Sequence, residues 1–288
     1  MRAVVTGAGG MLGQALVPAL AGAGWDVFPL DRLDADITRR DELRRAFAEA
    51  RPDWVFHLAA FTRVNECEDR EEYARLVNGH GAGNAATAAA ETGAAVLFVS
   101  TDYVFDGRAS EPYREDHPTA PLNAYGRSKE EGEKATRAAN PRHLIVRTAW
   151  LYGRGGRNFP DQIVEKARQG APLSVVDDQT GSPTWSRDLA PALVRLVGSG
   201  QLGTFHCTSS GQCTWFEYAR HLVSAEGLDT PVHAIRSADL GPPVRPAYSV
   251  LSNERYEQAT SNRMPNWKDS IDAYLESRRA EEAIGEET

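Results

Sequence analysis

Three glycines, Gly7, Gly10 and Gly13, separate a short apolar run from a helical pattern at the start of the chain. Between a strand and a helix, this spacing permits a tight turn, a close approach of the backbone to a pyrophosphate, and close helix–strand packing. The helix would begin at Met11 and Leu12, so the free amides of its first turn would face the phosphates. We therefore predict a dinucleotide-binding turn; a glycine turn with a purely structural role is the alternative.

Strand-like and helix-like segments alternate through the first 150 residues. Helical patterns separate short, almost fully apolar runs at 2–6, 25–30, 53–58, 94–99 and 143–147. Apolar strands separated by helices are typical of a parallel sheet covered on both faces. We expect an α/β fold with a doubly wound, Rossmann-type parallel sheet, in which residues 1–150 form the NAD(P)-binding domain.

The alternation loosens after Leu151. We expect residues 151–277 to form mainly a smaller C-terminal α/β substrate-binding lobe over the carboxyl edge of the sheet, with some segments returning to the sheet. Residues 278–288 are charged and low in bulky side chains, which predicts a disordered tail.

Composition excludes several classes of protein. There are 32 Lys+Arg against 40 Asp+Glu, a net charge of −8, and no basic run, which argues against binding of nucleic acid. The sequence contains no stretch of about 18 apolar residues, so it predicts no membrane span. Three cysteines, Cys67, Cys207 and Cys213, are an odd number outside any zinc-like spacing and favour a reducing compartment. We expect a cytoplasmic protein with no membrane partner.

Asp31 and Arg32 end the second predicted strand, 24 residues after Gly7. An acidic residue at this place normally binds the adenosine ribose, whereas an arginine holds a 2′-phosphate. Because both are present, we predict NADPH as cofactor, with NADH accepted; an exposed surface pair is the alternative. Asp36 and Ile37 follow where they could cap the adenine.

Tyr125 and Lys129 stand four residues apart in a helix predicted over 123–138, so both project from one face. Thr101 ends the fourth predicted strand, at the sheet edge where open α/β sheets bind ligands. A ketone reduction needs a proton delivered to oxygen, and a nearby ammonium would lower the high pKa of a tyrosine. We therefore predict Thr101, Tyr125 and Lys129 as catalytic residues, with Asn78 as a weaker candidate for proton transfer. A surface Tyr–Lys contact is the alternative.

These motifs, with His57-Leu58-Ala59-Ala60 after the third strand, resemble those of extended short-chain dehydrogenases/reductases. More specifically, the chain is similar to the dTDP-4-dehydrorhamnose reductase family over nearly its whole length, the tail excepted. The segments that carry this closer resemblance are STDYVFDG (100–107), PLNAYG (121–126), RTAWLY (147–152), DQTGSPT (178–184) and RPAYS (245–249).

The resemblance implies reduction of the C4 ketone of dTDP-4-dehydro-β-L-rhamnose by NADPH, giving dTDP-β-L-rhamnose. Tyr125 would donate the proton, Thr101 would bind the substrate oxygen, and Lys129 would hold the nicotinamide ribose. Ala59 and Ala60 match positions next to the cofactor.

Other residues match positions that contact the nucleotide-sugar substrate. Asp102, Tyr103 and Trp150 are of this kind, and the Trp150 ring would lie on the apolar face of the deoxysugar unless it is simply part of the core. Candidates for the diphosphate or the thymine are Arg63, Asn158 and Arg245.

Two departures from related patterns narrow the prediction. Some family members bind magnesium through acidic residues near the first helix, but Gln14-Ala15-Leu16 stands here, so we expect neither that metal site nor a metal-dependent dimer. A homodimer of another kind stays open. Related 4,6-dehydratases carry an Asp–Glu pair after the threonine, whereas this chain has Asp102 and then Tyr103.

Two other functions stay open. The chain could reduce another nucleotide-linked 4-ketosugar with the same catalytic residues. It could also be a non-catalytic NADP-binding regulatory subunit, like the β-subunit of methionine adenosyltransferase, although the intact Thr101, Tyr125 and Lys129 argue against this.

Overall fold

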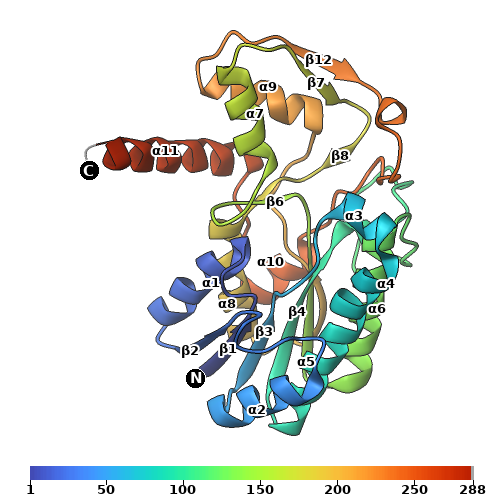
Figure 1. Ribbon diagram of the computed structural model, residues 1–288, viewed down its shortest axis with the longest axis vertical. Helices are drawn as coiled ribbons and strands as arrows, with labels where there is room; N and C mark the ends of the chain where they lie inside the picture. Colours follow the sequence, from blue (N-terminus) through green and yellow to red (C-terminus); the bar gives the residue numbers. More distant parts are fainter. Residues whose placement is uncertain (287–288) are drawn as a thin grey trace.

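A six-stranded parallel sheet forms the base of the molecule (Figure 1). The computed structural model describes residues 1–286. The strands lie in the order β10-β5-β4-β3-β1-β2, and the order reverses beside β1, where such sheets open a crevice at their carboxyl edge. Their bounds are β1 (Arg2–Thr6), β2 (Asp26–Leu30), β3 (Trp54–His57), β4 (Ala95–Thr101), β5 (His143–Thr148) and β10 (Gly203–His206).

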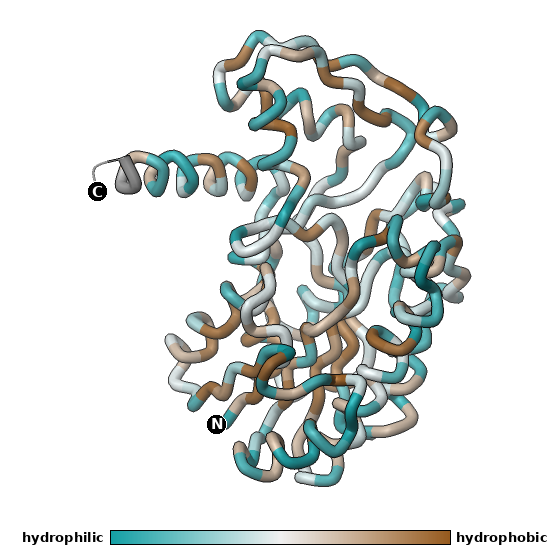
Figure 2. Tube along the Cα trace, viewed as in Figure 1, coloured by the Kyte–Doolittle hydropathy of each residue, from teal (hydrophilic) through white to brown (hydrophobic). Residues whose placement is uncertain are grey.

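Helices cover both faces of this sheet. On one face α1 (Met11–Gly22), α8 (Ser186–Gly198) and α10 (Glu254–Thr260) pack in a core that includes Leu16 and Leu193. The other face carries α2 (Arg40–Ala50), α5 (Gly81–Glu91) and α6 (Ala124–Ala139). Figure 2 shows the apolar strands between these more polar helices. The doubly wound parallel sheet expected from the sequence is confirmed.

The helical segment between β3 and β4 contains a change of helix type. It consists of α4 (Glu71–Ala74), a π-helical stretch η1 (Arg75–His80) and α5, with α3 (Val64–Asp69) just before it. Widened turns of this kind are common at functional sites. The π-helical stretch contains Asn78, the weaker catalytic candidate.

The smaller lobe lies above the carboxyl edge of the sheet (Figure 1). Its core is rich in aromatic side chains, among them Tyr152, Tyr218 and Trp267. Its helical elements are α7 (Phe159–Arg168), α9 (Trp215–Ala225), η3 (Ser237–Leu240) and α11 (Trp267–Glu286), whereas η2 (Asp102–Val104) follows β4. Its short strands pair as β6 (Leu151–Tyr152) with β9 (Thr184–Trp185), β7 (Leu173–Val176) with β12 (Val232–Ile235), and β8 (Thr180–Gly181) with β11 (Cys213–Thr214).

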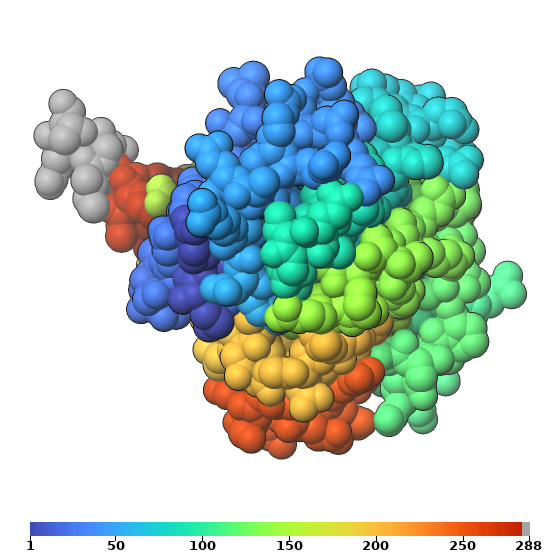
Figure 3. All heavy atoms as spheres, turned by 90° about the horizontal axis from the view of Figure 1, so that it is seen from below, coloured from blue at the N-terminus to red at the C-terminus, as the bar shows by residue number. Residues whose placement is uncertain are grey.

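The two halves of the sequence share the sheet. β10 pairs in parallel with β5, through Thr204 opposite Ile145, and α8 and α10 pack on the same sheet. The gold and orange segments beside the green and blue ones in Figure 3 belong to this returning part of the chain. Residues after 150 therefore build part of the dinucleotide-type sheet as well as the lobe.

The C-terminal segment differs from the disordered tail expected from residue 278. α11 continues to Glu286, and its arginines pair with carboxylates of other elements: Arg278 with Asp161 at 3.1 Å, and Arg279 with Glu226 at 2.8 Å. These partners are distant in sequence, so the charged composition misled the prediction for 278–286. Residues 287 and 288 lie outside the described residues. Within residues 1–286, no helix has the length and apolarity needed to cross a bilayer.

Candidate active site

A cavity of about 1050 Å³ lies between the carboxyl edge of the sheet and the smaller lobe. Both halves of the chain line it. It brings together most of the residues predicted from the sequence, namely Gly7, Gly10, Met11, Leu12, Gly13, Asp31, Arg32, Asp36, Ile37, Ala59, Ala60, Arg63, Thr101, Asp102, Tyr103, Tyr125, Lys129 and Trp150.

The glycine turn leaves room for a phosphate beside bare backbone. Gly7 has a φ of +71°, and a β-carbon there would lie 2.8 Å from the Ala59 backbone. A β-carbon on Gly13 would overlap the Ala8 carbonyl oxygen, so helix and turn touch directly. No side chain caps the N-terminus of α1 at Gly10, and its first turn holds no acidic residue. These residues fit a dinucleotide whose diphosphate takes hydrogen bonds from the free amides.

Asp31 and Arg32 differ in what they are free to bind. Both carboxylate oxygens of Asp31 accept hydrogen bonds from the Gly9 amide, at 2.9 and 3.1 Å. Arg32 is exposed at the cavity, and its charge helps to lower the pKa of Asp36, for which hydrogen bonds from Thr38 are the main cause. The acidic side chain is thus turned toward the glycine turn, while the guanidinium stays available to an anion.

Thr101 begins a short polar sequence at the end of β4. Its hydroxyl donates to Asp102 Oδ1 at 2.9 Å and accepts from the Tyr103 amide at 3.2 Å, because it caps η2. Burial raises the pKa of Asp102 to about 6, although hydrogen bonding to the carboxylate opposes the shift. The other carboxylate oxygen, Oδ2, is buried without a partner in the described part of the chain. Asp102 itself is one of the residues that line the cavity.

Tyr125 and Lys129 project from α6 into the cavity, but their pKa values differ from the sequence-based expectation. Burial, with the charge of Asp102, raises the pKa of Tyr125, and the Thr101 hydroxyl partly opposes this. Burial lowers the pKa of Lys129 to about 7. The Lys129 ammonium donates to the Val99 carbonyl at 2.7 Å and lies 4.1 Å from the centre of the Phe98 ring. The predicted lowering of the tyrosine pKa by Lys129 is therefore wrong for this structure.

Two asparagines fix the position of α6. The Asn123 side chain caps the helix by accepting from the Gly126 amide at 2.8 Å. Asn78, in the π-helical stretch, donates to Ser128 Oγ at 3.0 Å and exchanges two hydrogen bonds with the Phe61 backbone, at 2.7 and 2.9 Å. Asn78 thus joins α6 to the loop after β3.

Trp150 is held in an uncommon backbone conformation, with a φ of +46°. Its ring stacks on Trp215 of α9, with centroids 3.5 Å apart and planes at 7°. A β-carbon on Gly181 would overlap the Trp150 ring, so only a glycine fits beside it. One ring face is therefore covered by Trp215, whereas the sequence predicted a ring face lying on the sugar.

The three candidates for binding the diphosphate or the thymine either interact with other protein groups or lie outside the cavity wall. Asn158 is buried and caps α7, and Arg245 donates to Asn65 at 2.6 Å. The structure does not bring these two into the cavity lining. Arg63 does line the cavity, but it pairs with Glu66 at 3.0 Å.

Several lining residues carry no signal in the sequence. They lie mostly in loops and in the lobe, where neither periodicity nor a glycine pattern marks them. Examples are Thr38, Phe61, Arg70, Arg157 and Trp215. Among the described side chains, which end at residue 283, no group of three or more His, Cys, Asp or Glu could hold a metal ion.

Comparison with known proteins agrees with this geometry. A model of the RmlD substrate binding domain matches residues 1–280. The chain belongs to this family. A dTDP-4-keto-6-deoxy-D-glucose reductase of Streptomyces niveus is 42% identical over 275 residues, 94% of this chain and 95% of that protein. A dTDP-4-dehydrorhamnose reductase of Streptomyces griseus is 41% identical over 279 residues, 94% of this chain and 91% of that protein.

A solved structure of the RmlD family shares the whole fold. The dTDP-4-dehydrorhamnose reductase of Bacillus anthracis, in complex with NADP, matches with a TM-score of 0.93 and 34% identity, covering 96% of this chain and 99% of that one. The resemblance identified from the sequence motifs is confirmed.

Proposed function

We propose that this chain reduces the C4 ketone of dTDP-4-dehydro-β-L-rhamnose to dTDP-β-L-rhamnose with NADPH. The observation that carries the proposal is one cavity lined by Thr101, Tyr125 and Lys129 together with a glycine turn open to a diphosphate. The names of the RmlD-family relatives support the nucleotide-sugar substrate, and the NADP-bound relative supports the cofactor.

Tyr125 acts as the proton donor in this mechanism. When bound, the reduced nicotinamide supplies the hydride to the carbonyl carbon. Because burial raises the pKa of Tyr125, its phenol holds the proton that the developing alkoxide needs. Thr101 donates a second hydrogen bond to the same oxygen, in place of its contact with Asp102. Lys129 binds the nicotinamide ribose beside Tyr125 and is held in place by the Val99 carbonyl.

Arg32 selects NADPH in this proposal. Its guanidinium is exposed at the cavity, whereas the Asp31 carboxylate is occupied by the Gly9 amide. We expect Arg32→Ala to lose about tenfold in kcat/KM with NADPH and little with NADH, because only NADPH carries the 2′-phosphate. Initial rates with both cofactors measure this, and equal losses with the two would contradict the role.

A second substrate has a specific observation in its favour. The Streptomyces niveus relative, named as a reductase of dTDP-4-keto-6-deoxy-D-glucose, is 42% identical to the chain. The same catalytic residues would serve that ketone, because the hydride and the proton go to an equivalent carbonyl.

A coupled assay tests the proposal and separates the two substrates. dTDP-glucose is converted by a 4,6-dehydratase, with or without the 3,5-epimerase, and NADPH oxidation and the products are followed. Turnover only with the epimerase present, giving dTDP-rhamnose, supports the main proposal. Turnover without the epimerase would favour the second substrate, and no turnover in either case would favour a non-catalytic NADP-binding role.

The location and assembly expected from the sequence stay predictions. We propose a cytoplasmic protein in which any homodimer forms without bridging metal, because Gln14-Ala15-Leu16 supplies no acidic ligand. Light scattering coupled to gel filtration, with and without EDTA, measures the assembly, and cell fractionation measures the location.

A further inference from the structure

The loop between β6 and α7 carries two arginines, and one of them faces the cavity. Arg157 is exposed and lines the cavity that also contains the glycine turn. Among the side chains that the structure describes, those of residues 1–283, it has no ion-pair partner. Arg154, in the same loop, pairs instead with Glu281 of α11 at 2.6 Å and does not line the cavity.

This loop lies directly on the first turn of α1. A β-carbon on Gly155 would overlap the Gln14 side chain, and one on Gly156 would lie 3.2 Å from the Met11 methyl carbon. Gln14 in turn donates to the Gly9 carbonyl at 2.9 Å, so loop, helix and glycine turn form one packed unit. The loop therefore places Arg157 next to the N-terminus of α1, whose free amides can donate hydrogen bonds to a diphosphate.

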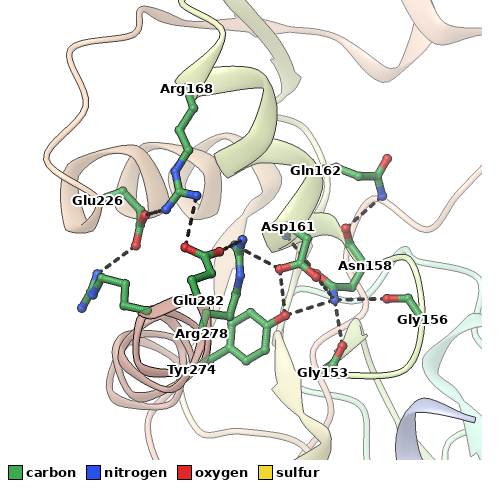
Figure 4. A network of polar contacts seen from close by, with 11 residues as sticks. Gly153, Gly156, Asn158, Asp161, Gln162, Arg168, Glu226, Tyr274, Arg278 and Glu282 are labelled. Atoms are coloured by element: carbon green, nitrogen blue, oxygen red, sulfur yellow. Dashed lines mark hydrogen bonds and ion pairs between the residues drawn. The ribbon is translucent and has the colours of Figure 1, made fainter. Parts of the chain in front are cut away.

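A buried network holds the loop in this position (Figure 4). The Asn158 amide donates to the Gly153 carbonyl at 2.8 Å and to the Tyr274 hydroxyl of α11 at 3.2 Å. Its oxygen accepts from the Asp161 amide at 2.9 Å. Asn158 is only 4% exposed, so the residue that precedes it starts from a fixed backbone.

Most other cationic side chains of the cavity already have an interaction partner. Arg63 pairs with Glu66, and the Arg70 guanidinium lies 4.3 Å from the centre of the Tyr73 ring. The Lys129 ammonium donates to the Val99 carbonyl, and Arg32 is assigned to the 2′-phosphate of the adenosine in the proposed function. A bound diphosphate carries two negative charges, and among these side chains Arg157 is the free cation beside the α1 N-terminus.

We propose that Arg157 binds the diphosphate of the dinucleotide cofactor, closing it against the N-terminus of α1. This inference rests on the proposed function, because it needs a cofactor of the NAD(P)H class. The nucleotide-sugar substrate carries the same diphosphate chemistry, so the test must separate the two ligands. Packing of the loop on Met11 and Gln14 favours the cofactor.

Equilibrium binding measures the role without turnover. We expect Arg157→Ala to raise the Kd for NADPH and for NADH by the same factor, about tenfold, because both share the diphosphate. The affinity for dTDP should not change. Titrations use the fluorescence of the reduced cofactor and calorimetry for dTDP, at two salt concentrations. Arg157→Lys should recover part of the affinity, because it keeps the charge but loses the bidentate contact.

Arg154→Ala is the matched control, since it removes an arginine of the same loop outside the cavity. We expect cofactor affinity to stay at the wild-type value in this variant. Unchanged cofactor binding in Arg157→Ala would overturn the inference and leave the proposed function intact, as would a loss confined to dTDP. A wild-type chain that binds neither NADPH nor NADH would overturn both.

Discussion

Burial sets the protonation states of individual residues around the cavity. It raises the pKa of Tyr125, raises that of Asp102 to about 6, and lowers that of Lys129 to about 7. Each shift favours the neutral form of its group. The tyrosine is thus kept as an acid, in agreement with its proposed role as donor, and the cavity depends on few fixed charges near the reacting oxygen.

Removal of the phenolic hydroxyl tests this role. We expect Tyr125→Phe to lower kcat by a factor of about 10²–10⁴, the usual contribution of a general acid. NADPH affinity should be kept, because the ring still packs edge-on against Tyr103, with centroids 5.9 Å apart. Single-turnover rates and fluorescence titration separate the two effects. Near-wild-type turnover would remove Tyr125 from the mechanism.

A buried histidine beside the glycine turn makes stability depend on pH. Burial lowers the pKa of His57 to about 3, so its folded-state value lies below that of the unfolded chain, near 6.5. As pH falls below 6.5, the His57 imidazole therefore binds a proton in the unfolded chain but stays neutral in the folded chain. His57 alone should cost about 2 kcal/mol of unfolding free energy by pH 5.

Urea denaturation of His57→Gln between pH 7.5 and 5 measures this contribution. We expect the variant to lose less stability than the wild type over that range, whatever its stability at pH 7.5. His80→Gln, at an exposed position, serves as the control and should keep the wild-type dependence. Identical slopes for His57→Gln and wild type would contradict the expectation.

At the scale of elements, the start of α7 joins the active-site loop to α11. Asn158 caps α7 and binds the Gly153 carbonyl, while Arg278 pairs with Asp161 in the first turn of the same helix. Arg168 near the end of α7 pairs with Glu226, which also holds Arg279 (Figure 4). α11 is thereby held against α7 and the end of α9, although its outer turns project from the body of the molecule (Figure 1).

Loss of this cap should destabilise the protein measurably. We expect Asn158→Ala to lower the free energy of unfolding by about 2 kcal/mol, because it removes a helix cap and leaves buried partners without hydrogen bonds. Asn158→Ser keeps a capping oxygen and should recover about half. Chemical denaturation measures both variants. If Asn158→Ala were as stable as the wild type, the network would have no structural role.

The sequence predicts those elements whose residues determine them locally. Three of the predicted apolar runs coincide with β1, β3 and β4, because a parallel strand that is buried on both faces consists of consecutive apolar residues. The sequence does not reveal Arg157 and Trp215, because tertiary packing of the lobe brings them to the cavity. The turns of α11 after residue 278 were missed for the same reason: their charged side chains find partners far away in sequence.

At the scale of the whole molecule, the lobe and the sheet are built from interleaved chain. β10, α8 and α10 lie on the sheet although they follow lobe segments in sequence. The chain crosses between the sheet and the lobe several times, so neither part is built from a single continuous segment. The sheet and the lobe therefore do not correspond to two separate stretches of the chain.

This interleaving predicts cooperative unfolding. Two tryptophans, Trp25 and Trp54, pack in the sheet core, whereas the other four, at 150, 185, 215 and 267, belong to the lobe. Tryptophan fluorescence therefore reports mainly the lobe, and far-ultraviolet circular dichroism reports the whole chain. We expect both to follow a single thermal transition with the same midpoint. A fluorescence transition that precedes the loss of secondary structure would show that the lobe unfolds separately.

The stacked indoles of Trp150 and Trp215 have an optical consequence. Two nearly parallel rings with centroids 3.5 Å apart couple their electronic transitions, and such a pair gives circular-dichroism bands of opposite sign when the two transition moments are rotated relative to each other within the stack. Both rings belong to the lobe and both line the ligand cavity, so a ligand that contacts or displaces either indole changes this signal. The protein therefore carries an intrinsic optical probe at its ligand cavity, and ligand entry can be timed by stopped-flow dichroism without any attached dye.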